Sequence, residues 1–402
     1  MCASTPKPRF IYITEYDISI DNGPGINERE FIDVLCKSYG EEVICLVPFP
    51  TYPEKYIDPR IEYVINHKRS NKLRYWAYLI DTFIRALRLY RRYHFSASVV
   101  RIGQTPFVPL MLSWLLKTPL LLKTLAQYTK FSGLKSPKQI IRNKILTFLY
   151  RATIKRALIS DTVSVQYIAW LHSKFGVPRE KLLLIPNGVN ISFFSPSDKD
   201  VSRRSLGLAH YKTIIGYVGA LRKLRNLEIL IRSFKLIENN RNIGLVLVGD
   251  GEHRTTLEKL VEEEGLTSKV NFIGQVPYSA IPDYMRAFDI GVDLTLIPME
   301  VEGKMLPASY SQKIPQYLAC GIPVIAWDII DNQFLKEEGI GESAPIGDST
   351  KLAKSILRLL DIDEVTRAKI KRKARMYAEI NFSISKLVAR RLEVWHRLIE
   401  SR

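Results

Sequence analysis

Short apolar runs alternate with amphipathic helical segments along this chain, and the alternation limits the folds that it can adopt. The runs are rich in Ile, Val and Leu and are bounded by Gly, Pro or Asn, as in buried parallel strands. Parallel strands need a crossover between them, so the pattern predicts an α/β protein with helices on both sheet faces. The clearest runs are 9–14, 43–47, 97–101, 120–122, 162–163 and 182–185 in the first half, and 213–218, 244–248, 270–273, 290–293 and 324–326 in the second.

The length of the chain predicts two domains. Its 402 residues exceed the usual size of a single hydrophobic core. The segment 186–200 is rich in Pro, Ser and Asn and separates two strand–helix patterns. We therefore predict two doubly wound, Rossmann-like domains at residues 1–190 and 191–380, followed by a helix over 381–402. Such sheets bind ligands at the carboxyl ends of their strands, so we expect a ligand crevice between the domains.

The cysteine and apolar patterns argue against several classes of protein. Cys2, Cys36, Cys45 and Cys320 are scattered, without a CxxC pair or a His–Cys cluster. This argues against a disulfide scaffold and predicts no metal site. The polar N-terminus lacks the apolar core of an export signal, and lysines and prolines interrupt the apolar segment 106–125, so no transmembrane span is expected. We expect a protein of the reducing cytoplasm.

The positive charge of the chain is concentrated in one region. The formal net charge is +18, and the segment 82–160 has fifteen Lys and Arg residues but no Asp or Glu. The segments 73–93 and 136–158 predict basic amphipathic helices, which would be drawn to nucleic acid or to an anionic membrane. Helices packed on the sheet with their arginines in water are the simpler alternative. Because no nucleic-acid-binding module is visible, we favour the anionic membrane surface and expect no nucleic-acid partner.

The segment 311–326 predicts a helix followed by a buried strand. The helix begins near Ser311 and ends at Gly321, the residue type that best tolerates a left-handed C-terminal cap. Free N–H groups at the start of such a helix favour an anion. Lys313 and Gln316 lie three residues apart and can face the same ligand. An ordinary helix–strand turn explains this segment equally well when it is taken alone.

Four loops of the second half follow predicted strands, and their positions predict that they meet at one edge of the sheet. They are 219–225, 249–252, 274–276 and 309–313. Arginine side chains, amides left accessible by glycines and a helix N-terminus together predict a cradle for a diphosphate. The sequence has no Walker A lysine motif, no GxSxG turn and no HExxH helix, which argues against an NTPase, an α/β-hydrolase and a zinc protease.

Five motifs in order give the chain a resemblance to a known family. They are Gly23-Pro24-Gly25, Ile185-Pro186-Asn187-Gly188-Val189-Asn190, Val248-Gly249-Asp250-Gly251-Glu252, 270–277 and 311–326. Over about 11–326 the chain resembles the GT-B-fold, retaining, nucleotide-sugar-dependent glycosyltransferases of the glycosyltransferase-4 type. The resemblance implies a GT-B fold whose C-terminal helix crosses back to the first domain. It also implies transfer of a hexosyl group, with retention, from a nucleoside diphosphate sugar.

The chain departs from this family at donor-binding positions. Where the family has an Arg and a Lys after the first strand of its second domain, this sequence has Ala220 and Arg225, with Arg222 nearby. The family's paired glutamates align with Ala308 and Gln316, and the Gln316 amide can still donate and accept hydrogen bonds. Glu300 or Glu302 is a candidate replacement for one of these glutamates. Gln127 and Lys130 are candidate replacements for a histidine that the family has in its first domain.

The resemblance and the loop positions together give a set of expected site residues. The predicted catalytic residues are Arg225, Lys313 and Gln316. The predicted donor-binding residues are Gly23, Gly25, Gly219, Arg222, Arg225, Gly249, Val276, Ser309, Ser311 and Gln316.

The expected partners follow from the same reasoning. They are a nucleotide-sugar donor, a lipid-linked or glycan acceptor of a polysaccharide pathway and an anionic membrane surface, with the protein peripheral at the inner face of the membrane. No cofactor is expected besides the donor substrate. The alternative is a catalytically impaired sugar-nucleotide-binding or scaffolding subunit of such a pathway.

Overall fold

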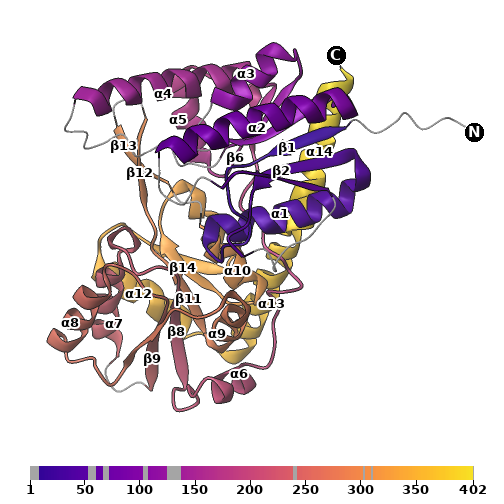
Figure 1. Ribbon diagram of the computed structural model, residues 1–402. Coiled ribbons are helices and arrows are strands. Elements are labelled where there is room, and N and C mark those ends of the chain that lie inside the picture. Colours follow the sequence, from indigo (N-terminus) through magenta and orange to yellow (C-terminus); the bar gives the residue numbers. More distant parts are fainter. Residues whose placement is uncertain are drawn as a thin grey trace, which may run out of the picture. The chain divides into compact units, whose positions relative to one another are not determined.

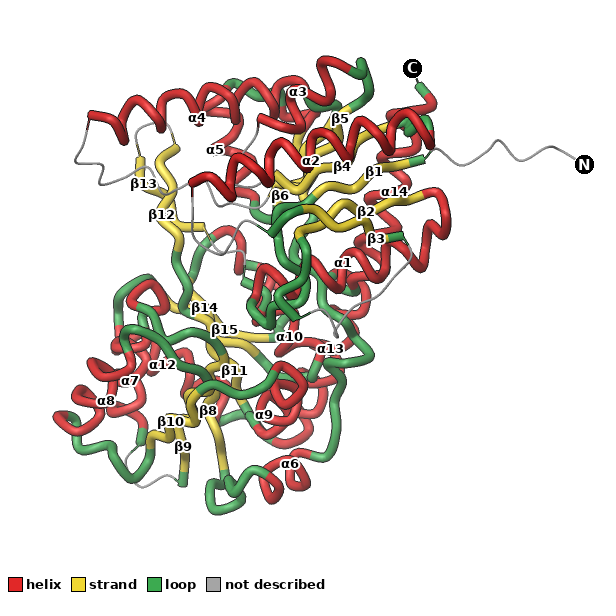
Figure 2. The backbone as a smooth tube through the Cα atoms, viewed as in Figure 1, coloured by secondary structure: helices red, strands yellow, loops and turns green. Residues whose placement is uncertain are grey.

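The chain forms two compact units. The computed structural model describes residues 9–52, 60–66, 72–102, 107–124, 137–238, 242–301, 304–308 and 311–401. The first domain comprises Met1–Pro186, Met299–Met305 and Ile384–Arg402, and the second comprises Asn187–Pro298 and Leu306–Ser383. Each domain contains a parallel sheet with helices packed on it (Figures 1 and 2). The α/β fold class predicted from the sequence is confirmed.

The first domain, over the residues described, has a seven-stranded parallel sheet in the order β3-β2-β1-β4-β5-β6-β7. Its strands are β1 (Phe10–Ile13), β2 (Val43–Pro48), β3 (Ile61–Val64), β4 (Ala97–Ile102), β5 (Leu120–Thr124), β6 (Ile159–Thr162) and β7 (Leu182–Leu184). The sequence pattern predicts no strand at β3, because only its first and last residues are buried. Strand β6 begins before the predicted 162–163. The strand order reverses between β1 and β4, where sheets of this kind bind ligands.

Two helices of the first domain that are far apart in sequence pack on the same sheet face. Over the described residues, the helices of the first domain are α1 (Gly23–Tyr39), α2 (Lys72–Tyr93), α3 (Phe107–Leu115), α4 (Pro137–Arg156), α5 (Val165–Phe175) and α14 (Ile384–Glu400). The two that share a face are α1 and α14. Phe31 of α1 and Trp395 of α14 are buried in one hydrophobic cluster with strand residues. Arg391 of α14 also donates from Nε to Asp161 of β6 over 2.6 Å. The predicted return of the C-terminal helix to the first domain is confirmed.

The turn Gly23–Gly25 lies inside the first turn of α1 and not in a loop before the helix. The side chain of Asn22 caps the helix by accepting from the Gly25 N–H over 2.9 Å. The proline between the two glycines has no N–H to satisfy at this position. A Cβ atom at Gly25 would lie 2.4 Å from the carbonyl oxygen of Ile20, so this position requires glycine.

The second domain, over the residues described, has a six-stranded parallel sheet in the order β10-β9-β8-β11-β14-β15. The strands are β8 (Thr213–Val218), β9 (Ile243–Val248), β10 (Val270–Gly274), β11 (Ile290–Asp293), β14 (Val324–Trp327) and β15 (Gly341–Ala344). Strands β12 (Ile297–Val301) and β13 (Lys304–Ala308) form a separate two-stranded pair, of which Met299–Met305 is assigned to the first domain. The helices are α6 (Lys199–Ser205), α7 (Leu227–Ile237), α8 (Arg254–Glu263), α9 (Ile281–Ala287), α10 (Lys313–Ala319), α11 (Phe334–Glu337), α12 (Ser349–Leu360) and α13 (Glu364–Asn381). The strand order reverses between β8 and β11.

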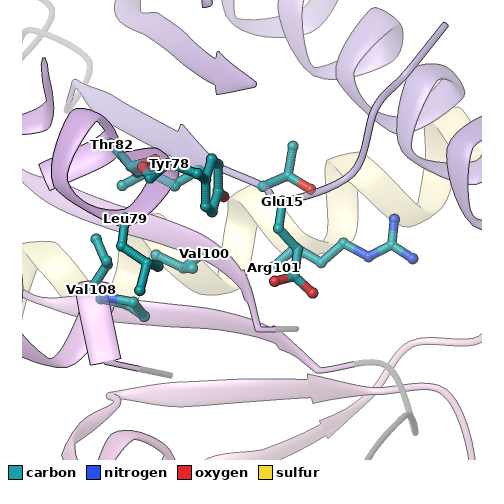
Figure 3. Close-up of a pocket in the computed structure, with 10 residues that line it drawn as sticks. Glu15, Tyr78, Leu79, Thr82, Val100, Arg101 and Val108 are labelled. Atoms are coloured by element: carbon teal, nitrogen blue, oxygen red, sulfur yellow. Dashed lines mark hydrogen bonds between the residues drawn. The ribbon is translucent and has the colours of Figure 1, made fainter. Parts of the chain in front are cut away.

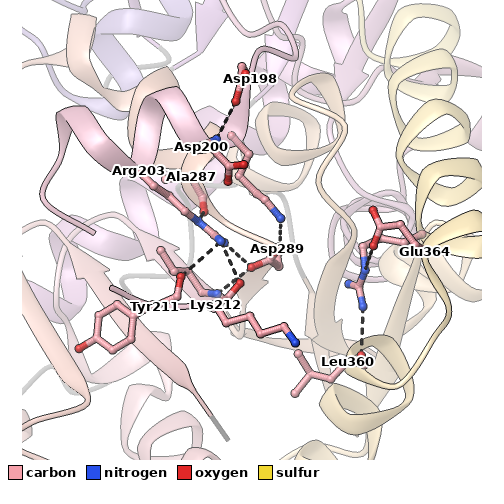
Figure 4. Close-up of polar contacts among 12 residues, drawn as sticks. Asp198, Asp200, Arg203, Tyr211, Lys212, Ala287, Asp289, Leu360 and Glu364 are labelled. Atoms are coloured by element: carbon pink, nitrogen blue, oxygen red, sulfur yellow. Dashed lines mark hydrogen bonds and ion pairs between the residues drawn. The ribbon is translucent and has the colours of Figure 1, made fainter. Parts of the chain in front are cut away.

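A buried carboxylate fixes the start of β11. Asp289 accepts from Lys199 Nζ over 2.7 Å, from the Ile214 N–H over 2.7 Å and from the guanidinium of Arg203 (Figure 4). Burial by itself raises the pKa of Asp289, but the Arg203 and Lys199 cations lower it below its ordinary value. These contacts join α6 to β8 and β11, and we assign them a structural role.

The helix predicted from Ser311 is shorter than expected. Helix α10 begins at Lys313 and has seven residues. It ends as predicted before Gly321, whose φ of +73° is in the left-handed region, and the Gly321 N–H donates to the Leu318 carbonyl over 2.9 Å. Because α10 has only about two turns, an anion site here depends on side chains more than on the helix dipole.

Candidate functional site

Two glycines follow neighbouring strands at the carboxyl edge of the second sheet. Gly219 follows β8 with a φ of +142°, and Gly249 follows β9 with a φ of +131°. A Cβ atom at Gly249 would lie 2.1 Å from the Gly219 carbonyl oxygen, so the two loops approach too closely for a side chain. Their N–H groups donate to the Val248 and Gly274 carbonyls over 2.8 Å each. These glycines therefore make room at the edge, and the expectation that their amides are free for a ligand is wrong.

Four polar side chains meet beside Gly219 and are called here the cation cluster: Arg225, Asp293, Thr295 and Lys313. Arg225 ends the short turn Lys223–Arg225 after β8, and its Nη1 donates to Thr295 Oγ1 over 2.6 Å. Lys313, the first residue of α10, donates from Nζ to Asp293 Oδ1 over 3.2 Å and to Thr295 Oγ1 over 3.4 Å. The Thr295 hydroxyl in turn donates to Asp293. The structure thus brings two of the three predicted catalytic residues together.

Close packing keeps Lys313 and Asp293 of the cation cluster away from water, whereas Arg225 is partly exposed. The Lys313 side chain is 12% exposed and that of Asp293 is 0% exposed. Burial lowers the pKa of Lys313 to about 8, with the Asp293 carboxylate opposing this effect and the Arg225 cation adding to it. Burial raises the pKa of Asp293, but Lys313 and Arg225 outweigh that effect and lower the pKa overall.

The cation cluster has an excess of positive charge. Two cations share the single carboxylate of Asp293. Within the described residues, Nε of Arg225 is buried and has no hydrogen-bond acceptor. An uncompensated buried charge is costly, and charge-assisted hydrogen bonds to an anion would offset that cost. The arrangement is therefore suited to a phosphate or diphosphate group.

Other predicted donor-binding residues lie outside the cation cluster. The Arg222 side chain is 60% exposed and lies 3.6 Å from the Glu252 carboxylate. Val276 is partly buried against the core of the second domain. Gln316 lies on α10, and across the described part of the chain its side chain makes no hydrogen bond. Ser311 is closer, because its hydroxyl accepts from the Lys313 backbone N–H over 3.0 Å.

The remaining predicted positions are distributed as follows. Ser309, Glu302, Gln127 and Lys130, and the side chain of Glu300, lie outside the described residues. Ala308, at the end of β13, is fully buried. Gly23 and Gly25 belong to the first domain, in the first turn of α1.

Asp293 and Thr295 are site residues that the sequence reasoning missed. Asp293 ends the apolar run of β11 and is 2% exposed. A carboxylate at the carboxyl end of a buried strand, next to the point where the strand order reverses, was the available signal.

The first domain has a small pocket at the corresponding place in its own sheet (Figure 3). It lies beyond the carboxyl ends of β1 and β4, and α2 and α3 supply its other walls. Figure 3 shows Glu15 on the same side of the pocket as Arg101, with Tyr78 and Leu79 reaching in from α2. The lining residues are Ile13, Thr14, Glu15, Tyr78, Leu79, Thr82, Val100, Arg101, Val108 and Pro109.

A buried ionic network lies beside this pocket. Glu28 of α1 accepts from the Tyr12 hydroxyl, from Arg101 and, over 3.2 Å, from Lys123 Nζ. Burial lowers the pKa of Lys123 to about 7, although the Glu28 carboxylate opposes this effect. Within the described residues, no group of three or more His, Cys, Asp or Glu side chains is arranged to hold a metal ion. The same residues contain no helix that is both long and apolar enough to cross a membrane.

Comparison with known proteins relates this geometry to a family. Residues 198–377 match the family model of the glycosyl transferases group 1. The D-inositol 3-phosphate glycosyltransferase 1 of Catenulispora acidiphila is 26% identical over 236 residues, which are 56% of this chain and 54% of that protein. The chain thus spans about half the length of this curated relative.

Solved structures resemble the chain along almost its whole length. Anabaena Alr3699/HepE in complex with UDP has a TM-score of 0.73 at 18% identity and covers 96% of this chain and 99% of its own. The sucrose-phosphate synthase of Thermosynechococcus elongatus has a TM-score of 0.75 at 20% identity and covers 98% of this chain and 100% of its own. Residues 198–377 thus match the glycosyl transferases group 1, and the two parallel-sheet domains of the chain have the GT-B fold of these solved structures.

Proposed function

We propose that the chain transfers a hexosyl group from a nucleoside diphosphate sugar, with retention of the anomeric configuration. The observation that carries the proposal is the cation cluster. It is a buried site with excess positive charge at the carboxyl ends of β8 and β11, inside the domain that matches the group 1 glycosyl transferases. The solved structure of Anabaena Alr3699/HepE with UDP-glucose supports a nucleotide sugar as the class of donor. Retention rests on the resemblance to the glycosyltransferase-4 type.

In this reaction the bond between the anomeric carbon and the diphosphate oxygen breaks, and the acceptor oxygen forms a new bond to that carbon. Negative charge develops on the departing diphosphate, and the acceptor proton leaves with it. Lys313 and Arg225 would stabilise this charge as preorganised donors in a site from which water is largely excluded. Orientation of the two substrates supplies much of the remaining acceleration.

Transfer of radiolabelled sugar from a panel of sugar nucleotides tests this function. We expect Arg225→Ala to lower kcat/KM by on the order of 10²-fold or more, as for loss of one oxyanion donor. The matched control is Arg222→Ala, which removes an exposed arginine from the same loop and should change kcat/KM less than threefold. Full activity of a folded Arg225→Ala protein would refute the assignment. An NMR spectrum of the product shows directly whether the anomeric configuration is retained.

We further propose a membrane-associated acceptor, because of an apolar surface on α2, α3 and α4. These helices contact one another in the order α2, α3, α4, and lie together over the first sheet (Figure 1). Trp76, Trp114 and Phe148 on them are 60%, 75% and 69% exposed. Further exposed apolar side chains on the same helices are Ile80, Ile84, Leu115, Ile140, Ile141 and Ile145.

The charge around this surface favours anionic lipid as its partner. On α2 the residues Trp76, Ile80 and Ile84 recur every four positions, so they form one stripe, and exposed Arg88 and Arg91 continue it. The segment 82–160 contains no acidic residue to oppose an anionic headgroup. Apolar side chains flanked by Lys and Arg are the pattern of a helix that lies in a membrane interface.

Sedimentation with anionic and with neutral vesicles tests this partner. We expect the triple variant Trp76→Ser, Trp114→Ser and Phe148→Ser to lose binding to anionic vesicles while it keeps transfer to a soluble acceptor. The control is Val365→Ser, which removes a 66% exposed side chain from α13 and should leave vesicle binding unchanged. RNA binding in a gel shift, without vesicle binding, would refute the membrane assignment.

A second candidate function is favoured by a specific observation. Ala308 and Gln316 stand where the family has glutamates, and this is compatible with a subunit that binds sugar nucleotide without turnover. Isothermal titration that detects nucleotide binding, together with no transfer to any acceptor, would support it. If the enzyme is active, Gln316→Ala should weaken donor binding and Gln316→Glu should be tolerated.

A further inference from the structure

Asp293 is the one carboxylate that contacts Lys313 within the described residues, and it stands at the end of β11, beside β8 at the reversal of strand order. Its Oδ1 atom accepts from Lys313 Nζ and from the Thr295 hydroxyl. The same hydroxyl oxygen accepts from Arg225. One carboxylate and one hydroxyl therefore connect both cations, although these come from different loops and are 88 positions apart in sequence.

We propose that Asp293 and Thr295 are positioning residues, which hold the Lys313 ammonium and the Arg225 guanidinium at the spacing needed to contact one diphosphate. This inference rests on the proposed function. The chain has Ala220 after β8, where the family has an arginine. Lys313 of α10 therefore provides the second cation, and Asp293 holds its ammonium group in position.

The contacts explain why such positioning residues are needed. Two neighbouring cations repel each other, and burial favours the neutral form of a lysine. Asp293 opposes both effects for Lys313. Its Oδ1 accepts from the lysine and from Thr295, and Nε of Arg225 has no acceptor in the described part of the chain. The arrangement orders the cations without neutralising both of them.

Other groups near Lys313 do not supply this role. The Tyr217 ring lies 5.3 Å from Lys313 Nζ, and the Tyr217 hydroxyl donates to the Ala220 carbonyl. The Tyr317 hydroxyl accepts from the Val218 N–H. The Ser311 hydroxyl oxygen accepts from the Lys313 backbone N–H. Each of these is a neutral contact, so the compensating negative charge comes from Asp293.

The test compares two buried carboxylates at the two ends of β11. Asp293→Asn should raise the donor KM at least tenfold at pH 8 and move the alkaline limit of kcat/KM to lower pH by one unit or more, because Lys313 then loses its proton more easily. Asp289→Asn removes the carboxylate that binds Lys199 and Arg203 (Figure 4). It should lower the melting temperature and leave that pH limit in place.

A second pair of variants addresses the hydroxyl alone. Thr295→Val keeps the shape of the side chain and removes its contacts to Arg225, Lys313 and Asp293. We expect kcat/KM to fall about tenfold without a shift of the alkaline limit, because the Asp293 charge beside Lys313 remains. Thr295→Ser keeps the hydroxyl and should retain most of the activity. Asp293→Glu should restore part of the pH profile that Asp293→Asn loses.

The outcomes separate this inference from the proposed function. If the parent protein neither binds nor turns over any sugar nucleotide, the proposed function fails. If the parent is active and Asp293→Asn keeps the parental donor KM and pH limit, or binds donor more tightly, Asp293 is not a positioning residue. If Asp293→Asn does not fold, the two Thr295 variants decide the question. Equal kcat/KM values for Thr295→Val and Thr295→Ser would then overturn the proposal.

Discussion

Donor binding should weaken above pH 8 because Lys313 loses its proton there. Burial lowers the pKa of this lysine from 10.5 to about 8. The protonated form binds the anionic diphosphate, so affinity is nearly full at pH 7, about half of that at pH 8, and approaches a tenfold decrease per unit at higher pH. Between pH 7 and pH 9 the protonated fraction drops about tenfold, equivalent to about 1.4 kcal/mol of binding free energy. A lysine with its ordinary pKa would lose almost nothing over this range.

Isothermal titration of the best sugar nucleotide at pH 7, 8 and 9 measures this effect. The diphosphate of a sugar nucleotide does not titrate in this range, and Lys313→Arg controls for the base, since a guanidinium stays protonated. We expect the Lys313→Arg affinity to be nearly constant from pH 7 to pH 9, and the Lys313→Met affinity to be low throughout. Parental binding that does not change with pH, or the same tenfold decrease in Lys313→Arg, would show that the charge of Lys313 does not control donor affinity.

Two further changes test the scaffold around the site. Gly249→Ala should lower the free energy of unfolding by several kcal/mol and abolish donor binding, because its Cβ would overlap the Gly219 carbonyl. The control is Gly265→Ala, since Gly265 has a φ of +67° and no atom within 4 Å of its added Cβ. In a denaturant titration this control should lower the free energy of unfolding by only about 1 kcal/mol. Arg391→Met should lower the free energy of unfolding by about 3–5 kcal/mol, because it leaves the buried Asp161 carboxylate unpaired. A loss under 1 kcal/mol would show that this ion pair does not hold α14.

Much of the fold follows from apolar runs of sufficient length. Strands such as β8 and β9 are buried along most or all of their length, so they appear in the sequence as runs in which Ile, Val and Leu predominate. Strand β3 is half-exposed and β12 and β13 each contain a proline, which argues against a strand in a sequence. These three elements could not be predicted from the same pattern.

The site could be predicted only in part, because its residues come from separate loops. Arg225 and Lys313 were named from their motifs, but their meeting point is set by Asp293 and Thr295, which no motif includes. The glycines were expected to present free amides. In the structure the Gly219 and Gly249 N–H groups donate to the Val248 and Gly274 carbonyls. These bonds depend on which loops lie side by side, and a sequence does not show that.

A crystal structure of the chain with its sugar nucleotide donor would show whether the cation cluster binds the diphosphate. We predict diphosphate oxygens within about 2.7–2.9 Å of Lys313 Nζ and of an Arg225 guanidinium nitrogen, the usual length of a charge-assisted hydrogen bond. A diphosphate held by Arg222 or by the first-domain pocket, without contact to Lys313 and Arg225, would show that the cation cluster is not the donor site.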